Sequence, residues 1–144
     1  SFTHRRMDEP EKHVSRLAAL QAYEMAGLGP EDMDVVEVHD ASAMGEIIQA
    51  ENLGLVPLGG GGPAAERGEF TLGGRTPINP SGGLESKGHP LGATGIGQLY
   101  ELVTQLRGDA GARQVEGARH AIQENGGGLQ GIEEAAVAVH ILSR

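Results

Sequence analysis

The sequence predicts an α/β layered fold, because short apolar strands alternate along the chain with longer segments of helical periodicity. The segments DVVEVH (34–39) and EAAVAVHIL (134–142) contain the Val and Ile residues that buried strands favour. Two Phe, two Tyr and no Trp among 144 residues require a mainly aliphatic core, which a chain of this length can form. We therefore expect one domain over residues 11–144, preceded by a polar and flexible start over residues 1–10.

The first half of the domain is predicted to form a helix, a strand and a second helix. Apolar residues recur with helical spacing over residues 11–27, and a short β-branched strand follows over residues 34–39. Residues 42–55 are expected to form the next helix, with Ser42 as its N-cap. Residues 56–80 are rich in Gly and Pro and have no periodicity, which predicts a functional loop inside the domain.

The second half is predicted to contain one long helix and two strands. The helix covers residues 94–107 and ends in a glycine-containing turn at residues 108–111. Residues 118–123 form the next expected strand, followed by a wide glycine turn over ENGGGLQGIE (124–133). The apolar segment 134–142 is expected to return antiparallel to strand 118–123.

Composition excludes several classes of function. A net charge of −9 argues against nucleic acid or an anionic membrane as a partner, because both favour basic surfaces. The chain has no cysteine, so it can form no disulfide, no zinc-thiolate site and no thiol nucleophile. The six histidines have no metal-ligand spacing, and we predict no metal site. No apolar run is long enough to span a membrane and no signal peptide is recognised, so we expect a cytoplasmic protein.

The segment KGHPLGATG (87–95) holds one histidine in a stiff turn just ahead of a helix. Gly88 permits backbone conformations closed to other residues, and Pro90 restricts His89 before it. Thr94 is the expected cap of the helix that follows. A histidine held in this way suits proton transfer at neutral pH, but a structural histidine in a glycine-rich turn fits the same pattern.

Two further segments carry candidate site residues. His39 ends a predicted strand, where α/β folds place their sites, and Asp40 could either orient it or cap the next helix. Glu124 and Asn125 follow another strand and precede three glycines, whose backbone N–H groups could bind an anion. A strand-end histidine and a loose hairpin loop remain the structural alternatives for these two segments.

Taken in this order and at these spacings, four segments together resemble the C-terminal half of the thiolase superfamily: EVHDAS (37–42), NPSGGLESKGHPLGATG (79–95), QLRGDAGARQVEGAR (105–119) and QENGGG (123–128). The similarity is greatest to the sterol-carrier-protein-type thiolases, a branch that includes lipid-transfer proteins and acetyl-CoA acetyltransferases. The resemblance implies a βαβαβαββ half of a five-layered α-β-α-β-α sandwich, of which this chain would be the second half.

The resemblance also implies roles for individual residues. His89 matches the histidine that activates a nucleophilic cysteine and helps to bind the thioester oxygen; that cysteine belongs to the first half of the family fold. His39 matches a position occupied by Asn or His, which holds a water or donates directly in the oxyanion hole. Gly126 matches the glycine whose backbone N–H completes a second oxyanion hole. From the glycine-rich segments themselves, we also assign Asn125 and Gly88 to substrate binding.

One position departs from the family pattern. Glu124 stands near the place where many thiolases carry a second cysteine as acid and base for the α-carbon of acetyl-CoA. A carboxylate could perform the same proton transfer if burial raised its pKa, so we predict a catalytic role for Glu124. The substitution could equally mean that thiolysis has been lost.

The expected function is therefore thiolysis or Claisen condensation of 3-oxoacyl-CoA, as the C-terminal half of an acyltransferase. The coenzyme A thioester is the substrate, and no covalently bound cofactor is expected. The expected partners are a cysteine-bearing thiolase N-terminal half and further copies in a homo- or hetero-oligomer. The alternatives are a thiolase-like retro-aldol lyase of steroid or lipid acyl-CoA side chains, with a DUF35-type partner, and a non-catalytic half that scaffolds a partner.

Overall fold

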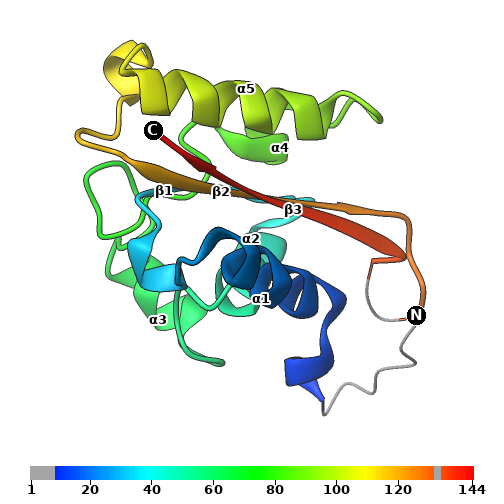
Figure 1. The fold of residues 1–144 in the computed structure, drawn as a ribbon. Helices are drawn as coiled ribbons and strands as arrows, with labels where there is room; N and C mark the ends of the chain where they lie inside the picture. Colours follow the sequence, from blue (N-terminus) through cyan, green and yellow to red (C-terminus); the bar gives the residue numbers. More distant parts are fainter. Residues whose placement is uncertain (1–8, 132–133) are drawn as a thin grey trace.

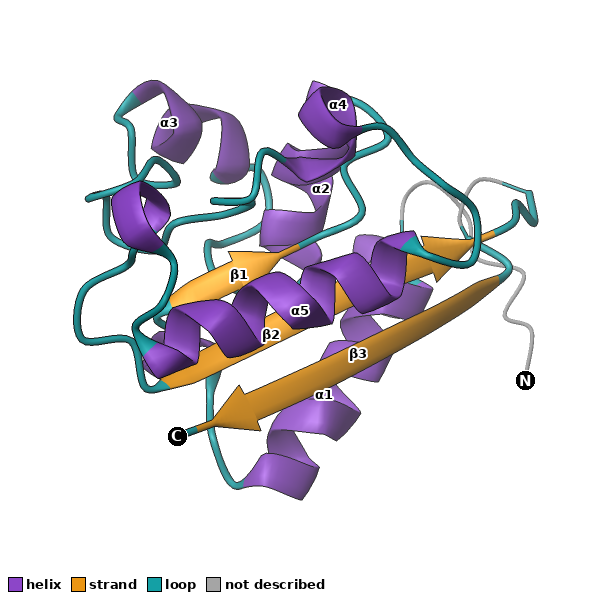
Figure 2. Cartoon of the chain, turned by 90° about the horizontal axis from the view of Figure 1, so that it is seen from above, coloured by secondary structure: helices purple, strands orange, loops and turns teal. Residues whose placement is uncertain are grey.

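The computed structural model describes residues 9–131 and 134–144, which fold around a small mixed sheet. Strands β1 (Val35–Glu37), β2 (His120–Gly127) and β3 (Ala136–Ser143) lie in the order β1-β2-β3. Strand β1 runs parallel to β2, and β3 returns antiparallel to β2, as Figure 2 shows. The predicted α/β class and the antiparallel return of the last strand are both confirmed.

Helices cover both faces of the sheet (Figure 1). One face is covered by α1 (Val14–Ala26), α2 (Ala43–Asn52) and α3 (Gly61–Glu66). The other carries α5 (Thr94–Arg107) and the short α4 (Gly83–Lys87). Single 3₁₀ turns lie at Pro10–Lys12, Pro30–Asp32 and Gly111–Arg113. The three layers place the sheet at the centre of the domain.

The core is divided by the sheet, because successive side chains of a strand point to opposite faces. Val36 and Ile122 pack toward α1 in the larger apolar cluster. Val35 and Ala121 pack toward Leu102 of α5 in the smaller one. All of these side chains are buried, so both faces of β1 and β2 contribute to folding.

The main difference from the predicted elements concerns β2. The sequence predicted a strand that ends at residue 123, but β2 continues to Gly127, so Glu124, Asn125 and Gly126 lie in the strand. Pairing with β3 explains the extension, since Asn125 faces Ala138 and Gly126 faces Val137 across the ladder. Tertiary pairing thus overrides the low strand propensity of glycine.

Smaller differences affect the loops and the helix ends. The segment 56–80, predicted as irregular, contains α3 and a parallel bridge between Ile78 and Val36. The predicted Ser42 cap is confirmed, because its hydroxyl oxygen accepts a hydrogen bond from the Gly45 N–H at 3.1 Å. Residues 1–8 of the predicted flexible start lie outside the described residues.

In the described part of the chain, no helix combines the length and the apolar character that crossing a membrane requires.

Candidate functional site

A cavity of about 750 Å³ opens where the parallel strands β1 and β2 both end. It is lined by His39 just after β1, by His89 and Leu91 ahead of α5, and by Asn125 and Gly126 of β2. The three segments singled out in the sequence therefore converge on one cavity. Sites in α/β folds commonly lie at this edge, beyond the carboxyl ends of the strands.

Two histidine rings meet in the cavity. The ring centroids of His39 and His89 lie 4.7 Å apart in an edge-to-face arrangement. Burial lowers the pKa of His39, and the neighbouring His89 lowers it further, whereas Glu134, Asp40 and the backbone of Gly126 oppose the shift. The net shift favours the neutral form of the His39 imidazole. Within the described residues its buried Nδ1 has no hydrogen-bond partner.

The Thr94 hydroxyl sets the orientation of His89. It donates to the Pro90 carbonyl (3.3 Å), which leaves its oxygen to accept a hydrogen bond from Nδ1 of His89 (2.7 Å). In the neutral ring this arrangement leaves the lone pair on Nε2, so Nε2 can act as a base. The predicted capping role of Thr94 is wrong: Ala93 occupies the N-cap position, and Thr94 is the first residue of α5.

Gly88 shapes the turn that carries His89. Its φ of 82° and ψ of 172° lie in a region open to glycine and closed to other residues without strain. The structure gives Gly88 this conformational role at the end of α4. A contact of Gly88 with substrate stays a prediction.

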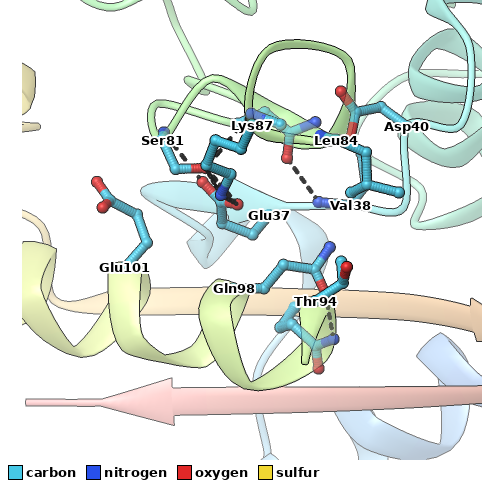
Figure 3. A network of polar contacts seen from close by, with 12 residues as sticks. Glu37, Val38, Asp40, Ser81, Leu84, Lys87, Thr94, Gln98 and Glu101 are labelled. Carbon is cyan, nitrogen blue, oxygen red and sulfur yellow. Dashed lines mark hydrogen bonds and ion pairs between the residues drawn. The ribbon is translucent and has the colours of Figure 1, made fainter. Parts of the chain in front are cut away.

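The segment that leads to His89 is tied to β1 by buried carboxylates (Figure 3). Glu37 of β1 accepts hydrogen bonds from the Ser81 hydroxyl (2.8 Å) and the Ser81 N–H (3.2 Å), with Lys87 Nζ 3.8 Å away. Asp40 accepts from the Leu84 N–H (2.7 Å), so it anchors α4 and does not cap the next helix. These bonds fix the two histidine-bearing segments relative to each other.

Glu124 lies behind His39, and its side chain is not among the groups that line the cavity. Its Oε2 accepts the backbone N–H of His39 (3.1 Å), and its Oε1 accepts the Ser15 hydroxyl (3.4 Å). The residue is 0% exposed, and this burial raises the pKa of its carboxyl to about 8. The structure thus gives Glu124 a supporting contact, and its role in proton transfer stays a prediction.

Three residues that line the cavity were missed by the sequence analysis: His13, Gln49 and Glu134. His13 is buried, and its Nδ1 accepts the Ser15 N–H (3.2 Å) at the start of α1. Gln49 donates to Glu134 Oε1 (2.9 Å) across 85 positions of the chain. No local pattern in the sequence could have indicated the contact of Gln49 with Glu134, because it joins distant segments.

Among residues 9–131 and 134–144, no group of three or more His, Asp or Glu side chains is arranged to hold a metal ion.

Comparison with known proteins identifies the family. A family model described as "Thiolase C-terminal domain-like" matches residues 1–144. This chain belongs to the thiolase C-terminal domain family. Figure 2 shows the part of that domain described here: two parallel strands, an antiparallel return and a long helix across them.

Individual relatives support the same family. The chain is 56% identical to rat sterol carrier protein 2 (Rattus norvegicus) over 112 residues, which cover 78% of this chain and 20% of the relative. It is 50% identical to an acetyl-CoA acetyltransferase of Methanothermobacter thermautotrophicus over 141 residues, 98% of this chain and 36% of the relative. The chain thus spans only a fifth to about a third of these thiolase relatives.

A solved structure of the same kind confirms the thiolase-like fold. The structure described as "Ltp2-ChsH2(DUF35) aldolase" matches with a TM-score of 0.74 and 25% identity. The match covers 90% of this chain and 31% of that chain.

The buried Glu124 predicts a dependence of stability on pH. Its carboxyl loses its proton near the ordinary pKa of 4.5 when unfolded and near 8 when folded. The folded protein therefore binds a proton that the unfolded chain has lost, and its stability falls as pH rises between these values. Glu124→Gln should remove this loss and raise the melting temperature relative to wild type more at pH 8.5 than at pH 5.

The control is Glu66→Gln on the exposed surface of α3, which should change the melting temperature equally at both pH values. Calorimetry resolves the difference, because 1 kcal/mol corresponds to roughly 2–4 °C in a domain of this size. An equal effect of Glu124→Gln at both pH values would contradict the assignment.

The contact of His89 with Thr94 predicts a defined tautomer. At pH 8 the imidazole nitrogen-15 shifts should place the proton on Nδ1, because Thr94 Oγ1 accepts it. Thr94→Val removes the acceptor and should move both shifts toward those of the opposite tautomer. Thr104→Val is the matched control, since the Thr104 hydroxyl donates to the Tyr100 carbonyl within α5. Unchanged shifts in Thr94→Val would refute the tautomer.

Proposed function

We propose that this chain is the C-terminal half of an acyl-CoA acyltransferase that catalyses thiolysis or Claisen condensation of 3-oxoacyl-CoA. The observation that carries the proposal is the pair of adjoining imidazoles, His39 and His89, in a cavity bounded by the glycine-rich end of β2. Acyl transfer needs a base for a nucleophile and fixed donors where negative charge develops. This arrangement can supply both.

His89 is proposed to activate the thiol. Its Nε2 lone pair takes the proton of a cysteine supplied from the other half, and the thiolate then attacks the thioester carbonyl. A ring N–H of His39 is proposed to stabilise the oxyanion, with the backbone N–H of Gly126 as a second donor. The low pKa of His39 suits this role, because a neutral ring donates without becoming a competing acid.

The proposed thiol-bearing half would pack against the outer face of α5. Ile96 and Tyr100 lie one helical turn apart and are 68% and 72% exposed, and Leu91 is exposed beside the cavity. Apolar side chains gathered in this way favour association. An N-terminal half docked here would lie next to His89 and could present its cysteine to the imidazole. The same exposed apolar side chains support the proposal that the complete protein associates further into an oligomer.

A retro-aldol lyase is the second candidate, because the solved structural neighbour is an aldolase that contains a DUF35 protein. The resemblance associates such relatives with tyrosines at the site. Here Tyr23 is buried and donates to the Leu53 carbonyl (3.0 Å), and Tyr100 lies on the outer face of α5. Neither is among the described residues that line the cavity, so the acyltransferase is favoured over the lyase.

The thiol requirement gives a first test. The isolated chain should show no thiolysis of acetoacetyl-CoA, since it contains no cysteine to form an acyl-enzyme. Addition of a cysteine-bearing thiolase N-terminal half, on the same or a separate chain, should restore the activity. Coenzyme A-dependent loss of the enolate absorbance measures it. Activity in the pure isolated chain would contradict the proposal, and so would an inactive complete protein.

Loss of the His89 imidazole should be severe in the complete protein. His89→Ala removes the proposed base and one donor, and loss of a single oxyanion donor typically lowers kcat by about 10²–10³. The melting temperature should hardly change, because the turn depends on Gly88 and Pro90. His120→Ala is the control: that ring bonds to Ser143 (2.9 Å) at the opposite end of β2. A decrease of less than tenfold in His89→Ala would make His89 structural.

A further inference from the structure

Resting on the proposed function, we propose that Glu134 is the carboxylate that exchanges a proton with the α-carbon of the acyl thioester bound in the cavity. Glu134 lies two residues before β3 and is one of the residues that line the cavity, together with His39 and His89. It lies outside the four segments that resemble the thiolase family.

One oxygen of the Glu134 carboxylate is fixed by contacts from the α1–α2 side of the domain. Oε1 accepts a hydrogen bond from Gln49 Nε2 at 2.9 Å. The ring of His13 lies on the other side, with Nε2 3.6 Å from Oε2. Because Nδ1 of His13 accepts the Ser15 N–H, a neutral His13 ring carries its proton on Nε2, facing Glu134.

The second oxygen of the carboxylate, Oε2, accepts no hydrogen bond from the described residues. Within the described part of the chain, Glu134 Oε2 is buried and has no hydrogen-bond partner, since 3.6 Å from His13 is too long for one. Buried polar atoms are normally satisfied, so an unpartnered one in a cavity is a candidate for contact with a ligand. The side chain as a whole is 21% exposed and lines the cavity, although Oε2 itself is buried.

Gly126 brings Glu134 into position. A Cβ atom at Gly126 would lie 2.4 Å from Glu134 Cγ, so only glycine lets this side chain rest against β2. Contact with Gly126 places the carboxylate beside the backbone group proposed as an oxyanion donor. The charge of Glu134 also acts on the His39 ring, whose pKa it tends to raise. The proposed base, Glu134, thus lies beside the two proposed oxyanion donors, the His39 ring and the Gly126 N–H.

Glu124 is less suited to the same step. Both of its carboxylate oxygens already accept hydrogen bonds, and the side chain does not line the cavity. Burial raises the pKa of its carboxyl to about 8, so near neutral pH it is largely protonated and holds no free base. Of the two glutamates near His39, Glu134 alone combines access to the cavity with an available oxygen.

The chemical step conserves all atoms and electrons. The Glu134 carboxylate takes one proton from the α-carbon of the thioester, and the electron pair of that C–H bond forms the enolate. The enolate oxygen accepts hydrogen bonds from the His39 ring and the Gly126 N–H. In condensation the enolate carbon attacks the carbonyl carbon of the acyl-enzyme, the C–S bond to the cysteine breaks, and the thiolate leaves and takes back the proton held by His89. In the reverse direction protonated Glu134 returns the proton to carbon. No oxidant or further reactant is needed.

The test separates this step from acyl transfer in the complete protein with its thiol-bearing half. Acetyl-CoA is incubated in D₂O, and mass spectrometry follows deuterium in its methyl group and, separately, acylation of the cysteine. Glu134→Gln keeps the shape and the Gln49 contact but removes the base. It should lower the rate of exchange at least 100-fold, within the range of general-base catalysis, while acylation and melting temperature stay near wild type. Glu134→Asp should recover part of the exchange.

Each outcome decides the assignment. Exchange at the wild-type rate in Glu134→Gln would overturn it, as would a selective loss of exchange in Glu124→Gln. Equal losses of exchange and acylation in Glu134→Gln would make Glu134 a structural residue and also overturn it. A wild-type protein that acylates its cysteine but exchanges no deuterium refutes only this inference. One that does neither refutes the proposed function as well. Glu66→Gln on exposed α3 controls for loss of a carboxylate elsewhere.

Discussion

Three residue pairs hold β1 parallel to β2: Val35 with Ala121, Val36 with Ile122 and Glu37 with Gln123. The parallel direction makes both strands end at the same edge, and the cavity opens there. If β1 slipped by one residue, Val36 and Glu37 would each turn to the opposite face, which would place the carboxylate in the aliphatic cluster and a valine at the buried polar contacts with Ser81. The apolar packing on both faces of β1 therefore fixes the position of His39, two residues beyond its end.

Buried carboxylates hold the loops of the site in place relative to strands β1 and β2. Glu37, Asp40 and Glu124 each accept a backbone N–H from a separate segment: Ser81, Leu84 and His39. Burying such groups opposes folding, and the raised pKa values of Glu37, about 7, and of Glu124, about 8, reflect this cost. In return, the hydrogen bonds specify where the loops lie, because an unpaired buried acceptor would cost still more. The buried carboxylates that position the loops of the site therefore lower the stability of the fold.

The cavity has two unequal sides. On one side the histidine pair faces the exposed end of α5, where Leu91 and Ile96 extend into solvent. On the other side Glu134 is enclosed by Gln49, His13 and Gly126. A nucleophile brought by a second half would approach from the first side, and the acyl α-carbon would lie toward the second. This division agrees with a reaction in which one group activates the nucleophile and another handles the proton on carbon.

The sequence by itself determined the features that depend on neighbouring residues. Helical periodicity predicted α1, α2 and α5, the Ser42 cap is a contact over three residues, and Gly88 and Pro90 marked the stiff turn of His89. The motifs also predicted that His39, His89 and Gly126 belong to one site, although not their geometry.

Only the tertiary structure decided that β2 extends through Gly126, because that extension depends on pairing with β3. It also decided which glutamate faces the cavity. Glu124 points behind His39 because strand side chains alternate according to register, and Glu134 meets Gln49 across 85 residues. Contacts between distant segments arise when the sheet and helices pack, and no local sequence pattern encodes them.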